Sequence, residues 1–470
     1  MNTPGVLNGT LVESSSQMLQ SIVLISPQIA VLLAAVGALV FEMLRLPKVS
    51  LPFTVIGLLV ATFLATQLVG ANATAFEGTY LVDDLSVWAV ILLSPTTALT
   101  AVLARQEVRD TDREGTVYSL LCFATVGALV LAGAGDVMFL VLGVLLSSLA
   151  TFALVAYPRD DRATEAAMKY FVFGSVTGAV MIFGLTYWFG IAGSTFLSAE
   201  ERLGSAPLAA GFGFVAVLVG LGYKASFVPF HFWAPDAYDG GPVSVAAFLS
   251  IVPKVGAIFA LVQVVRYLPA NATAWPLVIA GLAAITMTYG NLAALVQDNV
   301  VRLLAYSSIA QSGYFLLGVV AIGQSGLAVR SLILFTAAYV AMNLGAFAVV
   351  LSVGRDLRSF AGFGRTNPAA GVAMVIFLIS LVGIPPLAGF VGKFLLFGAA
   401  IDAGFTWLAV IAILNSVLSL GVYLRVVVPM YGQPKEVTAP SRTLAAVWMI
   451  ALVFTLGIGV TAQVLLGSIG

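Results

Sequence analysis

Charged residues are scarce in this chain. Only 9% of its 470 residues are Asp, Glu, Lys or Arg and 60% are hydrophobic, whereas charged residues make up about 25% of ordinary soluble domains. The mean hydropathy is correspondingly high, at +1.06. This balance excludes an ordinary soluble protein and indicates an all-α polytopic membrane protein. A transmembrane barrel would need short alternating segments instead of the continuous apolar runs of about 20 residues found here.

Cysteine and histidine occur once each, as Cys122 and His231. A single cysteine excludes a disulfide within the chain, and neither residue has the neighbours that a metal centre needs. Phosphate-binding, zinc-protease and haem-attachment motifs are also missing from the sequence. We therefore predict that the chain binds no cofactor and no metal, so a partner or an ion gradient must drive any transport. With a formal net charge of +0 and no basic tail, we expect a lipid bilayer but no nucleic acid as a partner.

Fourteen apolar segments are long enough to span a membrane when the chain is read in windows of about 19 residues. The segment 208–230 runs into Pro229, and the segment 371–400 contains Pro385 and Pro386. We predict that these helices, the seventh and the twelfth, are broken, because proline removes a backbone hydrogen bond and clashes with the preceding turn. No Lys or Arg precedes the first segment, which is predicted to be a true span rather than a signal peptide. The predicted helices cover residues 21–43, 51–70, 80–104, 115–133, 136–157, 167–191, 208–230, 242–266, 275–296, 302–322, 329–353, 371–400, 405–430 and 443–466.

Lysine and arginine in the loops predict the orientation. With the N-terminus outside, thirteen of these residues fall in inside loops and three in outside loops, which is a strong positive-inside bias. We therefore predict a multi-pass protein of a prokaryotic cell membrane, or an equivalent energy-coupling membrane, with both termini on the outer face. The inside group comprises Arg45, Lys48, Arg105, Arg109, Arg113, Arg159, Arg162, Arg302, Arg355, Arg358, Arg365, Lys435 and Arg442, and the outside group comprises Arg202, Arg266 and Arg330.

The two broken helices lie five helices apart, which indicates an internal repeat. Interrupted hydrophobic segments at corresponding positions are typical of inverted-repeat transporters. We predict helices 1–3 in residues 1–114, a first five-helix repeat in 115–266, a second, inverted repeat in 267–431, and helix 14 in 432–470.

Four of the six lysines lie inside predicted spans, namely Lys169, Lys224, Lys254 and Lys393. A lysine near the centre of a bilayer costs about 3 kcal/mol on insertion scales, so a functional role is the first hypothesis. A buried lysine can lose its proton near neutral pH, whereas an arginine cannot. The alternative is a lysine that snorkels to the interface. Snorkelling is harder from the deeper positions, but Lys169 lies near the start of its span and is also compatible with a positive-inside anchor.

Other polar groups extend the candidate site. His231 follows the first break and could relay protons, because its unperturbed pKa is about 6.5, or could simply cap the broken helix. A polar stripe in the tenth helix could hold a chain of water molecules or serve ordinary helix packing. No carboxylate falls in the middle of a span, so the lysines have no acidic partner in this chain. The stripe comprises Tyr306, Ser307, Ser308, Gln311, Ser312 and Tyr314.

Three strings of the sequence carry a family resemblance. They are Lys-Ala-Ser-Phe-Val-Pro-Phe-His-Phe-Trp-Ala-Pro-Asp-Ala-Tyr-Asp-Gly-Gly-Pro from Lys224, Arg-Leu-Leu-Ala-Tyr-Ser-Ser-Ile-Ala-Gln-Ser-Gly-Tyr from Arg302, and Gly-Ile-Pro-Pro-Leu-Ala-Gly-Phe-Val-Gly-Lys from Gly383. They resemble the antiporter-like membrane subunits of respiratory complex I, specifically the N subunit. The similarity runs from about the fourth to the thirteenth helix.

The resemblance implies fourteen helices that include two inverted five-helix repeats with broken helices 7 and 12. It also implies that Lys224, Lys254 and Lys393, with His231 between them, form a proton path along the membrane midplane. The implied partners are antiporter-like and small helical membrane subunits, together with a quinone-reducing peripheral module. Quinone and iron–sulfur clusters are expected in those partner subunits.

One position departs from the family pattern. The family usually has a glutamate in the fifth helix, in the context Leu-Gly-Leu-Glu-Leu, which pairs with the lysine of the seventh helix. The aligned residues here are Leu-Gly-Val-Leu-Leu from Leu142, so Leu145 stands in the place of the acid. The subunit therefore pumps by a modified route, receives the charge from a neighbour, or has lost pumping.

Three functions follow from these observations. The leading hypothesis is a proton-translocating subunit of a complex I-like oxidoreductase that passes electrons from NADH or another donor to quinone, with no redox centre in this chain. The first rival is a cation/proton antiporter subunit of the multi-subunit type, against which the string Trp-Ala-Pro-Asp-Ala-Tyr from Trp233 argues. The second rival is a non-pumping scaffold, which Leu145 favours and the deep lysines oppose.

Overall fold

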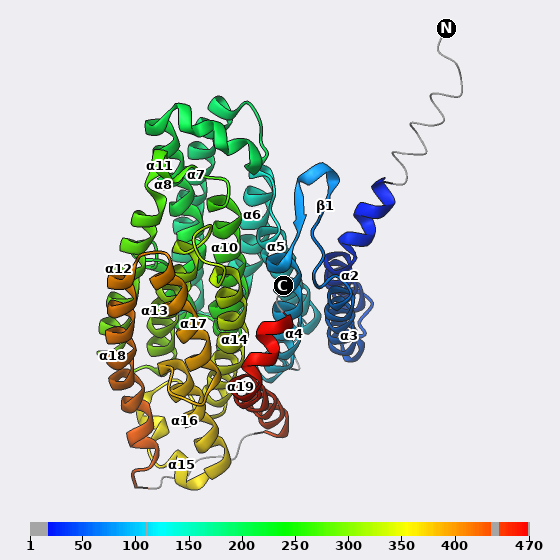
Figure 1. The fold of residues 1–470 in the computed structure, drawn as a ribbon. Helices are drawn as coiled ribbons and strands as arrows, with labels where there is room; N and C mark the ends of the chain where they lie inside the picture. The colour runs from blue at the N-terminus through cyan, green and yellow to red at the C-terminus, as the bar shows by residue number, and fades with distance from the viewer. Residues whose placement is uncertain (1–16, 110, 112, 434–440, 469–470) are drawn as a thin grey trace.

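The computed structural model describes residues 17–109, 111, 113–433 and 441–468. Over this part of the chain the protein is a bundle of long helices (Figure 1). The first half contains α2 (Ser26–Met43), α3 (Pro47–Thr66), α4 (Asp84–Val108), α5 (Glu114–Ala132), α6 (Val137–Val155), α7 (Asp161–Ala192), α8 (Pro207–Ala225), α9 (Trp233–Gly240) and α10 (Val243–Val265). The second half contains α11 (Ala270–Thr273), α12 (Trp275–Ala294), α13 (Val300–Val320), α14 (Ala328–Val353), α15 (Phe363–Thr366), α16 (Pro368–Val382), α17 (Ala388–Asp402), α18 (Thr406–Met430) and α19 (Arg442–Ser468).

The helices confirm the predicted multi-pass fold. Thirteen described helices are long and apolar enough to cross a membrane. The remaining predicted span, the twelfth, is the broken pair α16 and α17, whose halves have 15 residues each. A small hairpin of β1 (Ala73–Ala75) and β2 (Tyr80–Val82) between α3 and α4 was not predicted. Lys435, which entered the orientation prediction, lies outside the described residues.

Both predicted breaks are present, but each helix ends before its prolines. The α8 helix ends at Ala225 and is followed by Ser226 in the left-handed conformation, with φ 61°. The α16 helix ends at Val382 and is followed by Gly383, with φ 93°. A left-handed residue commonly ends a helix, and the residue before a proline is disfavoured in the helical conformation. The predicted range 208–230 was therefore about one turn too long at its end.

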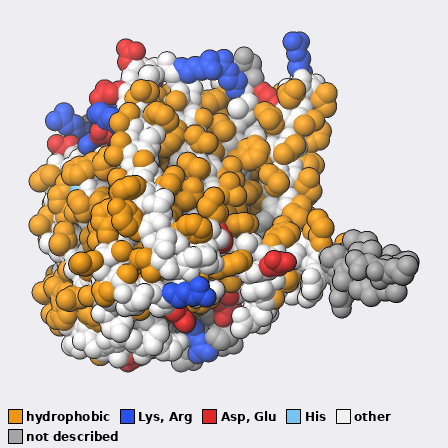
Figure 2. Space-filling model, turned by 90° about the horizontal axis from the view of Figure 1, so that it is seen from above, with side chains coloured by type: hydrophobic (Ala, Val, Ile, Leu, Met, Phe, Trp, Pro, Cys, Tyr) orange, Lys and Arg blue, Asp and Glu red, His pale blue; other side chains and the backbone are white. Residues whose placement is uncertain are grey.

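The bundle has a buried centre and an apolar rim. The most apolar stretches of α10, α13 and α14 are 100%, 94% and 89% buried, whereas those of α2 and α7 are each 28% buried. Figure 2 shows hydrophobic side chains across the middle of one face, with charged side chains gathered toward its margins. Such a rim suits contact with lipid, and the central helices are the ones that carry Lys254 and the polar stripe.

The order of elements is compatible with the predicted repeats. The first predicted unit contains α5, α6, α7, the broken pair α8 and α9, and α10; the second contains α12, α13, α14, the broken pair α16 and α17, and α18. The interruption occupies the fourth place in both units. The inverted relation between the units and the four-part division of the chain stay predictions.

Candidate functional site

Lys224 lies in the last turn of α8, beside the first break, and its side chain is fully buried. Its Nζ donates hydrogen bonds to Ser148 Oγ at 3.0 Å and Thr151 Oγ1 at 3.4 Å, both on α6. A third bond reaches Tyr170 Oη on α7 at 3.3 Å. Three hydroxyls from two neighbouring helices therefore surround the amine, and no carboxylate among the described residues pairs with it.

Lys254 follows Pro253 in α10, which continues through the proline without a break. Its buried Nζ donates to the carbonyl oxygen of Ser308 at 2.7 Å and to Ser308 Oγ at 2.5 Å. Tyr339 Oη of α14 donates to the same Oγ at 3.0 Å. The predicted stripe on α13 thus supplies the direct partners of this lysine.

Lys393 lies on the second half of the second broken helix and reaches back to the end of the first half. Its Nζ donates to the carbonyls of Leu381 at 2.9 Å and Val382 at 3.1 Å, and to Ser416 Oγ at 3.4 Å. The last carbonyls of a helix have no partner within it and carry partial negative charge. The ring of Tyr314 lies 3.8 Å from Nζ and adds a cation–π contact. The break therefore creates the site that holds the lysine.

The polar stripe of α13 connects these positions. Ser312 Oγ donates to the carbonyl of Ala225, next to Lys224, at 2.8 Å. Gln311 Nε2 donates at 3.1 Å to the carbonyl of Leu381, which also accepts from Lys393. Ser307 Oγ lies 2.6 Å from Tyr423 Oη, and Tyr314 Oη lies 3.1 Å from Ser416 Oγ. One helix thus contacts both breaks and Lys254.

Three predicted site residues lie apart from this arrangement. His231 is buried within the first break, where its ring packs on Phe232 and Tyr289, and no hydrogen bond among the described residues joins it to a lysine. Lys169 has a side chain that is 51% exposed and pairs with Glu165 and Asp236. Tyr306 is half-buried, with its ring near that of Tyr289.

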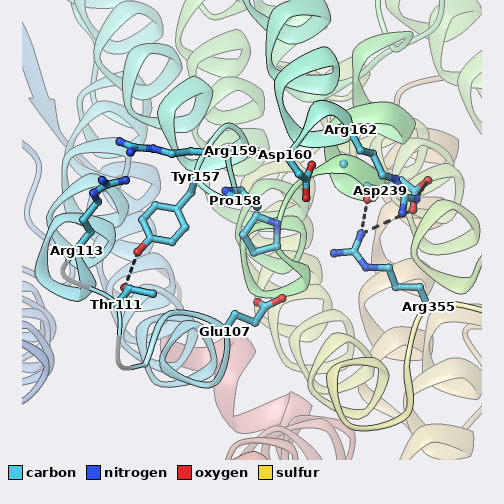
Figure 3. A pocket seen from close by; sticks show the side chains of 12 residues that line it. Glu107, Thr111, Arg113, Tyr157, Pro158, Arg159, Asp160, Arg162, Asp239 and Arg355 are labelled. Carbon is cyan, nitrogen blue, oxygen red and sulfur yellow. Dashed lines mark hydrogen bonds and ion pairs between the residues drawn. The ribbon is translucent and has the colours of Figure 1, made fainter.

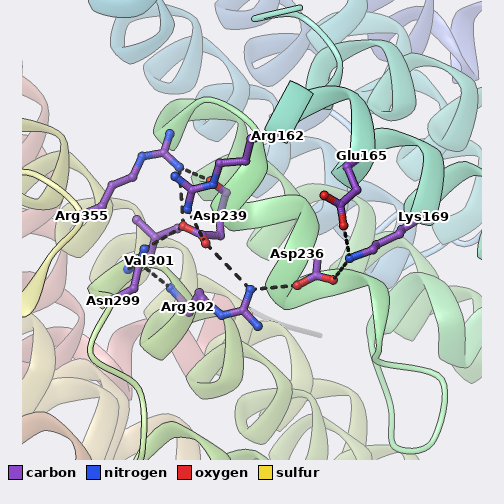
Figure 4. A network of polar contacts seen from close by, with 9 residues as sticks. All are labelled: Arg162, Glu165, Lys169, Asp236, Asp239, Asn299, Val301, Arg302 and Arg355. Carbon is purple, nitrogen blue, oxygen red and sulfur yellow. Dashed lines mark hydrogen bonds and ion pairs between the residues drawn. The ribbon is translucent and has the colours of Figure 1, made fainter. Parts of the chain in front are cut away.

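A network of ion pairs beyond the first break was not predicted (Figure 4). Asp239 of α9 accepts from Arg162 at 2.5 Å and from Asn299 at 2.7 Å, and Arg355 donates to its backbone carbonyl. Asp236, on the same short helix, pairs with Arg302 at 2.8 Å and Lys169 at 3.1 Å. Asp236 and Asp239 are three residues apart, so a helix places them on the same side. This spacing is the sequence pattern from which the network could have been predicted.

A cavity of about 550 Å³ adjoins the network (Figure 3). Its lining includes Asp239, Arg355 and Glu107. Glu107 accepts bonds from the backbone N–H groups of Val243 at 2.8 Å and Ser244 at 2.9 Å, so its carboxylate caps the start of α10. The cavity is lined by mixed charges at the face that the loop arginines predict to be the inner one.

The direct partners of the three buried lysines are hydroxyls, backbone carbonyls and the ring of Tyr314. No group of three or more His, Cys, Asp or Glu that could hold a metal ion occurs within the described ranges. Leu145 of α6 is 46% exposed and contributes nothing to the contacts of Lys224, which come from Ser148 and Thr151 of the same helix.

Interrupted helices and buried lysines in an apolar bundle are typical of antiporter-like polytopic membrane subunits. The chain belongs to the family described as "NADH:quinone oxidoreductase/Mrp antiporter, TM", whose profile matches residues 134–419. Relatives named NADH-quinone oxidoreductase subunit N, at 38–39% identity, confirm the predicted resemblance to complex I N subunits.

Similar sequences and structures agree with this family. The chain is 39% identical over 405 residues to NADH-quinone oxidoreductase subunit N of Mycobacterium sp. (strain JLS), covering 84% of this chain and 86% of the relative. It is 38% identical over 408 residues to F(420)H(2) dehydrogenase subunit N of Methanosarcina mazei, with 81% and 82% covered.

Among solved structures, a chain of respiratory complex I from Thermus thermophilus with bound Aureothin matches with a TM-score of 0.83 and 31% identity, over 94% of this chain and 98% of that one. A chain of the Mrp complex from Dietzia sp. DQ12-45-1b matches with a TM-score of 0.82 over 96% of each chain, and its 22% identity shows a likeness of fold alone. Both structures are of multi-subunit membrane complexes, which agrees with the prediction that this chain has other membrane-arm subunits as partners.

Proposed function

We propose that this protein is a membrane-arm subunit of a complex I-like quinone oxidoreductase that moves protons through Lys224, Lys254 and Lys393. The observation that carries the proposal is the burial of all three lysines, each at most 2% exposed, against hydroxyls and carbonyls with no carboxylate partner in the described part of the chain. A buried amine without a counter-charge can take up or release its proton when nearby charges change.

The polar stripe on α13 supports a continuous route. Ser308 holds Lys254, Ser312 contacts the backbone beside Lys224, and Gln311 shares a carbonyl with Lys393. Water between these groups would complete the route, because hydroxyls and amides both donate and accept hydrogen bonds. In this proposal His231 is a relay at the first break, and Lys169 belongs to the ion pairs at the predicted inner face.

The energy source lies in partner subunits. Electron transfer to quinone through iron–sulfur clusters in those partners would shift charge and change the protonation of the lysines. The donor is a property of the partners, since similar N subunits are named for both NADH-quinone oxidoreductase and F(420)H(2) dehydrogenase. Both termini would lie on the outer face of a prokaryotic membrane, as the loop charges indicate.

Substitution of two of the three buried lysines tests the proposal. In the complete complex reconstituted in vesicles, Lys254→Met and Lys393→Met should abolish proton translocation while the complex still assembles, because methionine keeps the aliphatic length and loses the proton-carrying amine. Lys169→Met is the matched control and should leave translocation near the native level, since this lysine is half exposed and pairs with two acids. If Lys254→Met and Lys393→Met both translocated protons at the native rate, the proposal would be wrong and a non-pumping scaffold would be the remaining function.

The alternative function, a subunit of a cation/proton antiporter, is tested by identifying the subunits that copurify with this chain. The family profile covers both kinds of protein, and the fold resembles a chain of an Mrp complex. Purification through a tag on this chain should recover iron–sulfur and quinone-binding subunits. Recovery of antiporter subunits alone, with sodium-dependent proton exchange in vesicles, would overturn the oxidoreductase assignment.

A further inference from the structure

The three lysines differ in the chemistry of the groups around them. Lys224 is held by the hydroxyls of Ser148, Thr151 and Tyr170, at 3.0, 3.4 and 3.3 Å from Nζ. We call these three groups the hydroxyl cage. An ammonium group has three N–H donors, so the cage provides one acceptor for each of them.

A hydroxyl can support either protonation state of a lysine. It accepts a hydrogen bond from the ammonium form, and after rotation its own hydrogen can bond the lone pair of the neutral amine. A carbonyl or a carboxylate can only accept, so it can bond the N–H groups of either form but cannot donate to the lone pair of the neutral amine. The hydroxyl cage therefore leaves Nζ of Lys224 hydrogen-bonded before and after it loses a proton, without movement of any helix.

Lys393 has the opposite surroundings. Its partners include the carbonyls of Leu381 and Val382 and the face of the Tyr314 ring, all of which attract a cation and none of which can donate to a lone pair. Ser416, at 3.4 Å, is the one hydroxyl that contacts its Nζ among the described residues. After release of a proton, the two remaining N–H groups of Lys393 can still bond the two carbonyls, but only this one contacting group among the described residues can donate to the lone pair, against three such groups around Lys224.

The ring of Tyr170, one member of the hydroxyl cage, is packed on two sides. The ring of Tyr170 stacks on Trp233 with centroids 4.1 Å apart and meets Phe152 edge-on at 4.7 Å. Trp233 is itself fixed by a hydrogen bond from Nε1 to the carbonyl of Tyr223 at 2.8 Å. Packing on both sides therefore holds Tyr170 Oη beside Nζ and, at 3.1 Å, beside Thr151 Oγ1.

We infer that Lys224 is a position where the proposed path gains and loses its proton in place, with Tyr170 and Thr151 as the groups that exchange it and with Ser148 as a positioning residue. This inference rests on the proposed function. In the loading step, Tyr170 Oη gives its proton to the neutral amine and takes one from Thr151 Oγ1, which takes one from a hydronium ion delivered through water, so that neither a tyrosinate nor an alkoxide remains and neutral water is released. Unloading reverses each transfer.

Paired tyrosine variants test the inference in the assembled complex reconstituted in vesicles. Tyr170→Phe keeps the stacked ring and removes the hydroxyl. The rate of proton translocation should fall about a hundredfold, the lower end of the cost of losing a positioned proton-transfer group. Tyr223→Phe is the matched control, because its hydroxyl lies in the same aromatic cluster and bonds the backbone carbonyl of Tyr170 at 3.4 Å instead of Nζ. It should retain native translocation.

A second pair of variants separates chemistry from packing. Thr151→Val should lower translocation, and Thr151→Ser should restore it, because only the serine keeps a hydroxyl at that position. If Tyr170→Phe and Tyr223→Phe both lost translocation, the threonine variants would show whether the hydroxyl or the packing matters. Equal loss in Thr151→Val and Thr151→Ser would overturn the inference.

Lys224→Met distinguishes failure of the inference from failure of the proposed function. Loss of translocation in Lys224→Met with native translocation in Tyr170→Phe would overturn the exchange role of the hydroxyl cage and leave the proposed path intact. Native translocation in Lys224→Met would remove Lys224 from the path and overturn both.

Discussion

At the scale of the residue, Lys254 shows how one charged side chain is accommodated deep inside an apolar bundle. Both of its acceptors belong to Ser308, whose Oγ also accepts from Tyr339. Tyr339 Oη lies 3.0 Å from the carbonyl of Ser250 as well, and Asn343 bonds the hydroxyl of Ser250 at 2.5 Å. The cost of burying the amine is offset by this network, since an unpaired buried charge is far more expensive than a hydrogen-bonded one.

Ser308→Ala should weaken this support without removing it. The carbonyl of Ser308 remains as an acceptor, so we expect proton translocation to fall about two- to tenfold, corresponding to the loss of one hydrogen bond. Ser331→Ala is the control, because the one partner of that buried hydroxyl in the described part of the chain is the carbonyl of Ala328 in the same helix. Translocation assays in vesicles should separate the two, and an unchanged rate in Ser308→Ala would exclude the hydroxyl from the path.

At the scale of the element, the second break depends on close packing between the two half-helices. Gly389, in the first turn of α17, donates its N–H to Ser380 Oγ at 3.1 Å. A Cβ atom at this position would lie 1.8 Å from the carbonyl oxygen of Ser380. The glycine thus permits the approach that brings Lys393 within reach of the last carbonyls of α16.

Gly389→Ala should therefore destabilise the subunit. Overpacking of this kind typically costs about 1–3 kcal/mol, and the clash here is with backbone, which cannot rotate away. We expect a lower apparent melting temperature in detergent and a loss of proton translocation. Gly398→Ala in the same helix should change neither, because its nearest contact would be an ordinary 3.6 Å to Leu327. Equal melting temperatures for both variants would show that the break adapts easily.

At the scale of the whole molecule, the ion pairs beyond the first break join the two predicted repeats. Asp239 belongs to the first unit, whereas Arg302 and Arg355 belong to the second, and each has a nitrogen 3.8 Å from an Asp239 carboxylate oxygen. The side chain of Asp239 is only 12% exposed. Its position at the predicted inner face, next to the cavity that Glu107 lines, makes the network a structural link between the units.

Asp239→Asn should leave several arginines without their shared acid. The free energy of unfolding should fall by about 2 kcal/mol, which is less than for a fully buried ion pair because the arginines are partly exposed. The melting temperature of the purified complex should fall accordingly. Glu165→Gln serves as the control, since Glu165 is 68% exposed and its pair with Lys169 contributes little. A fall of equal size in both variants would contradict a special role for Asp239.

The sequence alone determined the membrane fold, the two breaks and the burial of Lys224, Lys254 and Lys393, because long apolar runs, prolines and isolated charges have large energetic consequences in lipid whatever surrounds them. The tertiary structure decided which groups meet those charges. The hydroxyl cage of Lys224 comes from α6 and α7, and Lys169 of α7 pairs with Asp236 of α9. Contacts between helices depend on packing angles and rotation about each axis, which hydropathy does not encode.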